Sequence, residues 1–243
     1  MKHTSYADIT YNHKNFMVRF AHLKRNFYVK KLINSLKPKT ILDYGTGDGE
    51  LYKNLDLNKL CKIILFEPES KMFKDLKKNL QKIPNSNNCI PLKNIKNISS
   101  KKFDLILCLE VLEHLPLTER MKFYKLCSNN LKKNGSCIIE VPIEYGPILF
   151  LKEFGRKYLK SRKTEYSMKE LFLSVFFGKI IDKHNRFDLY DKRTFISPRH
   201  GFDLFKFLDE LKSYGDVKFL YNSPFKFLPK ILNKSVVLRL KPR

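Results

Sequence analysis

Hydrophobic and polar positions alternate along this chain in blocks that predict strands and helices in turn. Short apolar runs at 40–44, 62–66 and 103–109 have the length of buried strands, and the last run is apolar at nearly every position. Strands that are buried on both faces show this pattern, which favours a parallel sheet. Two further runs towards the C-terminus, 217–221 and 235–240, are also expected to be strands.

Helical patterns lie between these runs. Apolar residues recur near a period of 3.6 over 14–37 and again over 70–82, and Pro38 ends the first pattern. A third helix is expected to contain Met121 and Tyr124 and to end at Asn134-Gly135, a dipeptide typical of a helix C-terminus. A strand at 136–141 follows, and the remaining helices are expected at 168–176 and 202–213.

The alternation of strand and helix is interrupted once, between residues 143 and 200. This pattern predicts an α/β fold with a doubly wound, mostly parallel sheet and an inserted helical cap. The expected segments are an N-terminal helical segment at 1–37, a core at 38–142, the substrate cap at 143–200, and a C-terminal helix and strands at 201–243.

The composition agrees with one such domain in the cytoplasm. A chain of 243 residues with 43% hydrophobic residues can bury one sizeable core. It contains neither the long apolar stretch of a membrane span nor, near Met1, the apolar centre of a signal peptide. The five cysteines are scattered without a C-x-x-C pair, which favours free thiols over a disulfide framework or a zinc site.

The formal net charge of +24 has two interpretations. The first is that the protein binds an anionic partner. This partner is a nucleic acid, an acidic membrane surface or a phosphorylated small substrate. The other is compositional, because a lysine-rich chain is typical of an AT-rich genome. We favour the second interpretation for the total charge and consider local basic clusters separately.

Three glycines follow the first strand in the pattern Asp43-x-Gly45-x-Gly47-x-Gly49. Glycines at this place allow a tight turn and a close approach of the backbone to a ligand. The dinucleotide fingerprint requires a glycine at position 50, where the chain has Glu50. Glu67 ends the second strand, at the distance from the glycines where an acid binds both hydroxyls of a ribose. Together these features predict a nucleoside cofactor with cationic groups.

The run 41–49 resembles the first motif of class I S-adenosylmethionine-dependent methyltransferases, and Glu67 matches the acid that ends their second strand. The segment 103–115 is similar to their fourth-strand motif, and 131–135 to the segment before their fifth strand. The resemblance covers residues 38–142 and implies a seven-stranded, Rossmann-like sheet with S-adenosyl-L-methionine as cofactor.

Residue by residue, the resemblance implies that the acid and glycines of the loop border the methionine part of the cofactor and that Glu67 binds its ribose. Asn94, or its neighbour Ile95, is expected after the third strand, near the adenine. The cofactor-binding residues implied in this way, together with Glu110 at the end of the fourth strand, are Asp43, Gly45, Gly47, Gly49, Glu67, Asn94 and Glu110.

Methyl transfer to a hydroxyl requires alignment of the acceptor and removal of its proton. His114 is the best-placed general base, since its spacing from Glu110 predicts that both lie on one side of a short turn. The alternative is that His114 only caps or packs against the following helix. No metal site is predicted, because position 110 is not the histidine that an inverted zinc-protease motif requires.

The expected cap contains a cluster of arginine residues, whereas most basic residues of the chain are lysines. Arginine side chains suit phosphate and carboxylate groups. The pattern His184-x-Arg186, followed by His200-Gly201-Phe202, is also similar to the region before the last helix in methyltransferases of bacterial surface-polysaccharide (capsule) synthesis. We therefore expect an anionic, nucleotide-activated substrate. Its expected contacts are Arg186, Arg199, the second candidate base His200, and Tyr145.

Two alternatives remain open at this point. The charge suggests an RNA methyltransferase, although no motif for base amines and no appended RNA-binding domain is recognisable. The second alternative is that the chain is a non-catalytic, methyltransferase-like binding module. The basic segment 152–163 and the apolar stripe 168–176 also suggest peripheral contact with a membrane, although such a stripe is more often the buried side of a cap helix.

Overall fold

The computed structural model describes most of the chain. The chain divides into two compact units. The first unit consists of Met1–Leu109 and Lys125–Ile138, and the second unit consists of Glu110–Tyr124 and Ile139–Arg243. The described residues are 16–53, 55, 62–83, 86–98, 100–158, 166–178 and 202–242.

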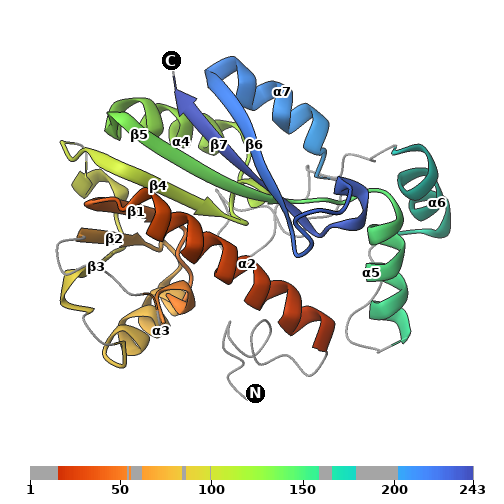
Figure 1. The fold of residues 1–243 in the computed structure, drawn as a ribbon, viewed down its shortest axis with the longest axis horizontal. Helices are drawn as coiled ribbons and strands as arrows, with labels where there is room; N and C mark the ends of the chain where they lie inside the picture. Colours follow the sequence, from red (N-terminus) through yellow and green to blue (C-terminus); the bar gives the residue numbers. More distant parts are fainter. Residues whose placement is uncertain are drawn as a thin grey trace. The chain divides into compact units, whose positions relative to one another are not determined.

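The strands form one seven-stranded sheet in the order β3-β2-β1-β4-β5-β7-β6 (Figure 1). In the first unit β1 (Thr40–Tyr44) pairs in parallel with β2 (Lys62–Phe66) and with β4 (Phe103–Leu109). These three strands have the predicted bounds. Their central residues are buried, as expected for strands that are covered on both faces. The predicted doubly wound, mostly parallel sheet is confirmed.

The carboxyl ends of three strands are level with one another. Tyr44 of β1 is in register with Phe66 of β2, and Phe66 is in register with Leu92 of β3 (Cys89–Leu92). The residues that follow these strands therefore start from one line at one edge of the sheet. Ligands of doubly wound sheets bind at this edge.

The hydrophobic pattern did not indicate β3, although the resemblance implied a third strand before Asn94. β3 is an edge strand, and its Pro91 is opposite Leu65 of β2. Proline has no N–H group to donate to a neighbouring strand, so it is tolerated at an edge of the sheet. In the sequence alone, a proline within a short run argues against a strand.

The prediction that Asn134-Gly135 ends a helix is wrong. Helix α4 (Leu117–Asn130) ends earlier, and β5 (Leu131–Pro142) begins at the next residue, so the dipeptide lies inside the strand. A Cβ atom on Gly135 would lie 2.9 Å from the carbonyl oxygen of Phe103. The glycine is needed there because the backbones approach closely.

Two helices of the first unit lie where the hydrophobic pattern predicted helices. Helix α2 (Phe16–Leu36) covers most of the expected range 14–37, of which residues 14 and 15 lie outside the described part. It buries Arg25, Val29 and Ile33, whereas Leu23 and Phe27 are exposed. Helix α3 (Ser70–Leu80) buries Leu76 and Leu80, and the Glu69 side chain caps its first turn by accepting hydrogen bonds from the N–H groups of residues 71 and 72.

Within its described residues, the second unit contains the C-terminal hairpin, three whole helices and part of α4. β6 (Gly215–Ser223) and β7 (Ser235–Pro242) pair antiparallel, and α7 (Leu204–Tyr214) precedes them. Helices α5 (Pro147–Tyr158) and α6 (Met168–Phe177) lie within the predicted cap segment. Among the described residues, no helix combines the length and the apolar character that crossing a bilayer requires.

Candidate active site

The glycine loop after β1 has the conformation that its sequence predicts. Gly45, Gly47 and Gly49 all have positive φ angles, of 80°, 63° and 76°. L-residues adopt this region only with strain, so the three glycines allow the turn. The loop is held to the neighbouring strand because the N–H groups of Gly45 and Thr46 both donate to the carbonyl oxygen of Phe66, at 2.9 and 3.1 Å.

Gly47 and Gly49 serve the loop in different ways. A Cβ atom on Gly47 would meet no atom within 4 Å, so the backbone borders open space at this position. A Cβ atom on Gly49 would lie 2.7 Å from Cδ1 of the buried Leu76 of α3. Gly49 therefore allows close packing of the loop on α3, whereas Gly47 leaves room for a ligand.

Glu67, the residue after β2, connects the ends of the first two strands. Its Oε2 accepts a hydrogen bond from the N–H group of Gly47 at 2.9 Å, and its Oε1 accepts one from the N–H group of Glu69 at 2.9 Å. Glu67 is buried, because only 5% of the residue is exposed to solvent. Each carboxylate oxygen has a second lone pair, so the group retains the capacity to accept two hydroxyl donors.

Burial raises the pKa of Glu67 to about 7. The two backbone N–H donors oppose this shift, and the nearby carboxylates of Glu69 and Asp43 add to it. The group is therefore poised between its neutral and ionised forms near neutral pH. Perturbed carboxyl groups of this kind gather at functional sites.

Asp43 lies at the end of β1 and is also buried. Burial raises its pKa to about 6, while hydrogen bonds from Thr46 and Tyr52 and the positive charge of Arg25 oppose the shift. The Tyr52 hydroxyl donates to Asp43 Oδ2 at 3.0 Å. The sequence pattern did not indicate Tyr52 or Arg25 as partners of Asp43. The position of Arg25 among the apolar positions of a helix was a signal for a buried, paired cation.

Asn94 is placed as expected, two residues after β3, and it is exposed. Its Oδ1 accepts a hydrogen bond from the N–H group of Lys96 at 3.0 Å, which makes a local turn. Its role towards adenine stays a prediction.

Glu110 follows β4 and begins the second unit. It has a φ of 55°, which is unusual for a residue other than glycine. Its N–H group donates to the carbonyl oxygen of Glu140 at 2.9 Å, and its Oε1 lies 3.9 Å from Nζ of Lys234. Such backbone strain is concentrated at functional sites, where the surrounding structure maintains it.

His114 is not related to Glu110 in the way that the spacing predicted. Only Leu112–His114 form a 3-10 turn, so the four-residue spacing does not place the two side chains on one α-helical face. Instead, Nε2 of His114 lies 3.8 Å from Oε1 of Glu113, which is fully buried. A carboxylate at this distance stabilises the imidazolium that a general base becomes when it takes a proton.

Of the four predicted substrate contacts, the structure describes Tyr145. It is buried, its ring lies 5.1 Å from that of Phe205, and burial raises its pKa. Arg186, Arg199 and His200 lie outside the described residues. Their roles stay predictions.

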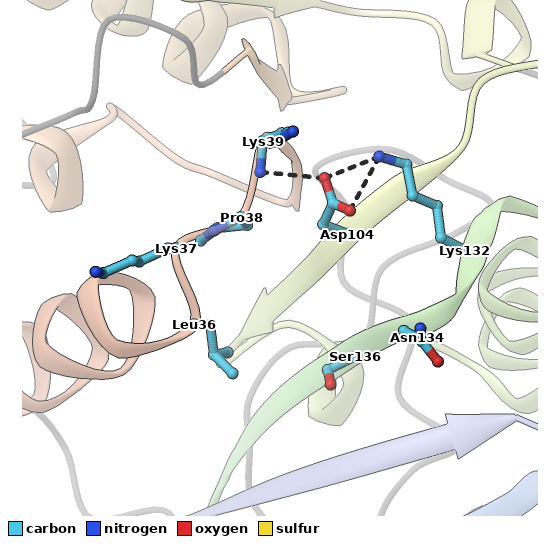
Figure 2. A pocket seen from close by; sticks show the side chains of 8 residues that line it. All are labelled: Leu36, Lys37, Pro38, Lys39, Asp104, Lys132, Asn134 and Ser136. Atoms are coloured by element: carbon cyan, nitrogen blue, oxygen red, sulfur yellow. Dashed lines mark hydrogen bonds and ion pairs between the residues drawn. The ribbon is translucent and has the colours of Figure 1, made fainter.

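A cavity of about 390 Å³ lies at the other end of β1, near Lys39 and Asp104, and Figure 2 shows the side chains around it. In Figure 2 the Asp104 carboxylate bridges Lys39 and Lys132, accepting from the Lys39 N–H group at 3.1 Å and from the Lys132 ammonium group at 2.9 and 3.0 Å. None of the predicted site residues lines this cavity. It is therefore separate from the glycine loop.

The comparisons with known proteins give the family. The family model described as a methyltransferase domain matches residues 11–192, which is most of the chain. This chain belongs to that methyltransferase family. Its cofactor is accordingly S-adenosylmethionine. No curated protein matches the chain.

Solved methyltransferases share the fold. The methyltransferase domain of a bacterial Hen1 protein (CtHen1-CN) is similar with a TM-score of 0.57 and 15% identity, over 90% of this chain and 97% of that domain. Magnesium protoporphyrin IX methyltransferase (ChlM) from Synechocystis PCC 6803, solved with bound SAH, has a TM-score of 0.52 and 14% identity, over 93% of this chain and 87% of that one. At 14% and 15% identity, the similarity of this methyltransferase to the two structures shows a shared fold alone.

Proposed function

We propose that this methyltransferase binds S-adenosylmethionine at the glycine loop and Glu67 and transfers its methyl group to an oxygen of a small anionic acceptor. The bound cofactor supplies a methyl group on a positively charged sulfur. The hydrogen bond between Gly47 N–H and Glu67 Oε2 carries this proposal, because it brings the loop and the ribose-binding acid into direct contact.

The residues present fit the cofactor. The two lone pairs that remain on the Glu67 carboxylate match the two hydroxyl donors of a ribose. The open space at Gly47 allows the ligand to approach the backbone. Asp43 contributes negative charge towards the ammonium and sulfonium groups, and Tyr52 orients its carboxylate.

We assign the proton transfer to His114. As the acceptor oxygen takes the methyl group that the bound cofactor would supply, its hydroxyl proton would move to the imidazole of His114. The buried Glu113 carboxylate stabilises the resulting imidazolium. An acceptor that is already an anionic oxygen would need no base.

The anionic character of the acceptor rests on the arginines of the cap. The resemblance of that segment to methyltransferases of surface-polysaccharide synthesis makes a precursor of a bacterial capsule the acceptor class that we propose. Arg199→Ala is expected to raise the Michaelis constant for such an acceptor. An unchanged constant would contradict this assignment.

Two measurements on the whole chain test the proposal. Calorimetry is expected to show binding of S-adenosylhomocysteine, weakened by at least about tenfold in Glu67→Gln, because two charge-assisted hydrogen bonds are lost. Methyl transfer is expected to fall by about 10²–10⁴-fold in His114→Gln, with cofactor affinity unchanged. Cofactor binding without transfer to any acceptor would indicate a binding module instead.

Nucleic acid is the second candidate acceptor, favoured by the net charge of +24. Binding to RNA through phosphate contacts weakens steeply with salt. Protection of RNA that declines steeply with salt, together with methylation of that RNA, would support this alternative against the small acceptor.

A further inference from the structure

Three elements of the second unit expose large apolar side chains: α5, α6 and the segment 225–232 between β6 and β7. Helix α5 contacts both α6 and the Lys230–Leu232 turn, so the three elements are neighbours, and Figure 1 shows α5 beside α6. We call their exposed side chains the apolar surface. It includes Leu151, Phe154, Phe172, Phe176, Phe227 and Leu228.

Helix α6 is apolar at most of its positions, and yet Ser174 is its one buried residue. Phe176 is 70% exposed. A helix that is apolar nearly all round normally lies in an apolar environment. In the loop, Phe227 is 95% exposed. Large apolar side chains that are exposed together on neighbouring elements indicate an interaction site.

The loop of this surface is positively charged. After Asp216 the chain contains five lysines and two arginines, and no acidic residue. Lys226 and Lys230 are exposed and flank Phe227 within the loop. The core of a protein–protein interface is depleted in lysine. Phenylalanine beside lysine instead suits a lipid surface, where the ring enters the boundary of the acyl chains and the ammonium group meets anionic head groups.

We propose that the apolar surface docks this protein on an anionic lipid bilayer. Phe227 and Leu228 enter the interface, together with the exposed faces of α5 and α6. Lys226 and Lys230 contact lipid phosphates. The docking is peripheral, because it uses side chains of a loop and of two short helices.

The docked surface is joined to the residues that follow β4 and β5. Lys234, at the end of the loop, lies 3.9 Å from Glu110, and its carbonyl oxygen accepts from the N–H group of Ile143 at 2.8 Å. The N–H group of Gly146 donates to Ser174 of α6. If the proposed function holds, the acceptor meets the enzyme at the membrane surface. The docking itself does not depend on that function.

Co-sedimentation of the full chain with vesicles tests the proposal without an activity measurement. We expect binding to vesicles of equal parts phosphatidylglycerol and phosphatidylcholine, and much weaker binding to phosphatidylcholine alone. Phe227→Ser is expected to lower the partition coefficient by on the order of tenfold. The control is Leu117→Ser on α4, an apolar residue outside the surface that is 51% exposed, and this variant is expected to bind like the wild type.

The charge is tested by Lys226→Gln with Lys230→Gln, which is expected to weaken binding to anionic vesicles by about fivefold per lysine. Lys74→Gln with Lys77→Gln makes the same charge change on exposed positions of α3 and is expected to have little effect. Equal binding to neutral vesicles, or an equal loss in both double variants, would overturn the proposal. So would a dimer in solution that dissociates in Phe227→Ser, because a second copy would then cover the surface.

Discussion

Glu67 accepts hydrogen bonds from two backbone N–H groups, and burial nevertheless raises its pKa to about 7. In our account it binds the ribose hydroxyls as a carboxylate, so the affinity for S-adenosylhomocysteine should follow its ionised fraction. We expect the affinity to rise by about tenfold between pH 6 and pH 8 and then to level off. Calorimetry across this range tests the prediction, and Glu67→Gln should remove the dependence. An affinity that falls with pH would contradict it.

The same residue should make the ligand-free protein less stable as the pH rises. The pKa of Glu67 is raised from 4.5 in the unfolded chain to about 7 in the fold. Between these values the native state binds more protons than the unfolded state. The free energy of unfolding should therefore decline through this window, by up to about 3 kcal/mol. Urea denaturation at several pH values measures this, and Glu67→Gln should show a flatter profile.

Gly47 and Gly49 provide a matched pair of substitutions. Gly49→Ala combines a positive φ with a contact of 2.7 Å to Leu76, so it should lower the free energy of unfolding by about 2–3 kcal/mol. Gly47→Ala meets open space and should cost only about 1 kcal/mol, while it weakens cofactor binding. Thermal denaturation and calorimetry of both variants test this. Equal effects on stability and on binding would contradict the separate roles.

At this scale the sequence indicated the loop and Glu67 because the chemistry of both is local. Tyr52 and Arg25 were not predicted as partners of Asp43. Tyr52 is nine residues away and Arg25 comes from α2, and only the folded chain brings them to the carboxylate. The pairing of His114 with Glu113 was missed for a related reason, because the spacing was interpreted as an α-helical turn and the chain forms a 3-10 turn.

At the scale of elements, Asp104 joins Thr40, the first residue of β1, and the preceding Lys39 to β5. Its Oδ2 accepts hydrogen bonds from the N–H groups of Lys39 and Thr40, at 3.1 and 2.9 Å, and from the ammonium group of Lys132. Burial opposes ionisation, but the bonds from Lys132 and Thr40 outweigh it and lower the pKa of Asp104. This carboxylate therefore fixes the amino ends of neighbouring strands.

We expect Asp104→Asn to lower the free energy of unfolding by about 1–2 kcal/mol, because the backbone N–H donors lose a charged acceptor. Lys132→Gln removes only an ion pair that is partly exposed and should cost less than about 1 kcal/mol. Urea denaturation of the two variants compares them. A larger loss in Lys132→Gln would show that the ion pair, and not the backbone bonds, holds the strand ends.

The bounds of an element could be predicted where burial alone determines its pattern of apolar residues. The strands β1, β2 and β4 are buried on both faces, and their apolar runs gave the correct bounds. β3 was missed because its edge position admits Pro91, and the start of β5 was missed because Gly135 serves a close backbone contact. In both cases the local pattern reflects a tertiary contact that the sequence alone does not display.

At the scale of the whole molecule, the sheet order and the family match agree with a methyltransferase. The two compact units divide the candidate residues between them. The cofactor acid Glu67 belongs to the first, and Glu110 and His114 belong to the second. The central claim of our account is that the glycine loop and Glu67 of the first unit bind the cofactor.

A crystal structure of the complex with S-adenosylhomocysteine tests this claim most directly. We predict that both ribose hydroxyls donate to the Glu67 carboxylate and that the methionine part lies along Gly45 and Gly47. A nucleoside bound away from the end of β2, or a glycine loop that contacts no part of the ligand, would contradict the account.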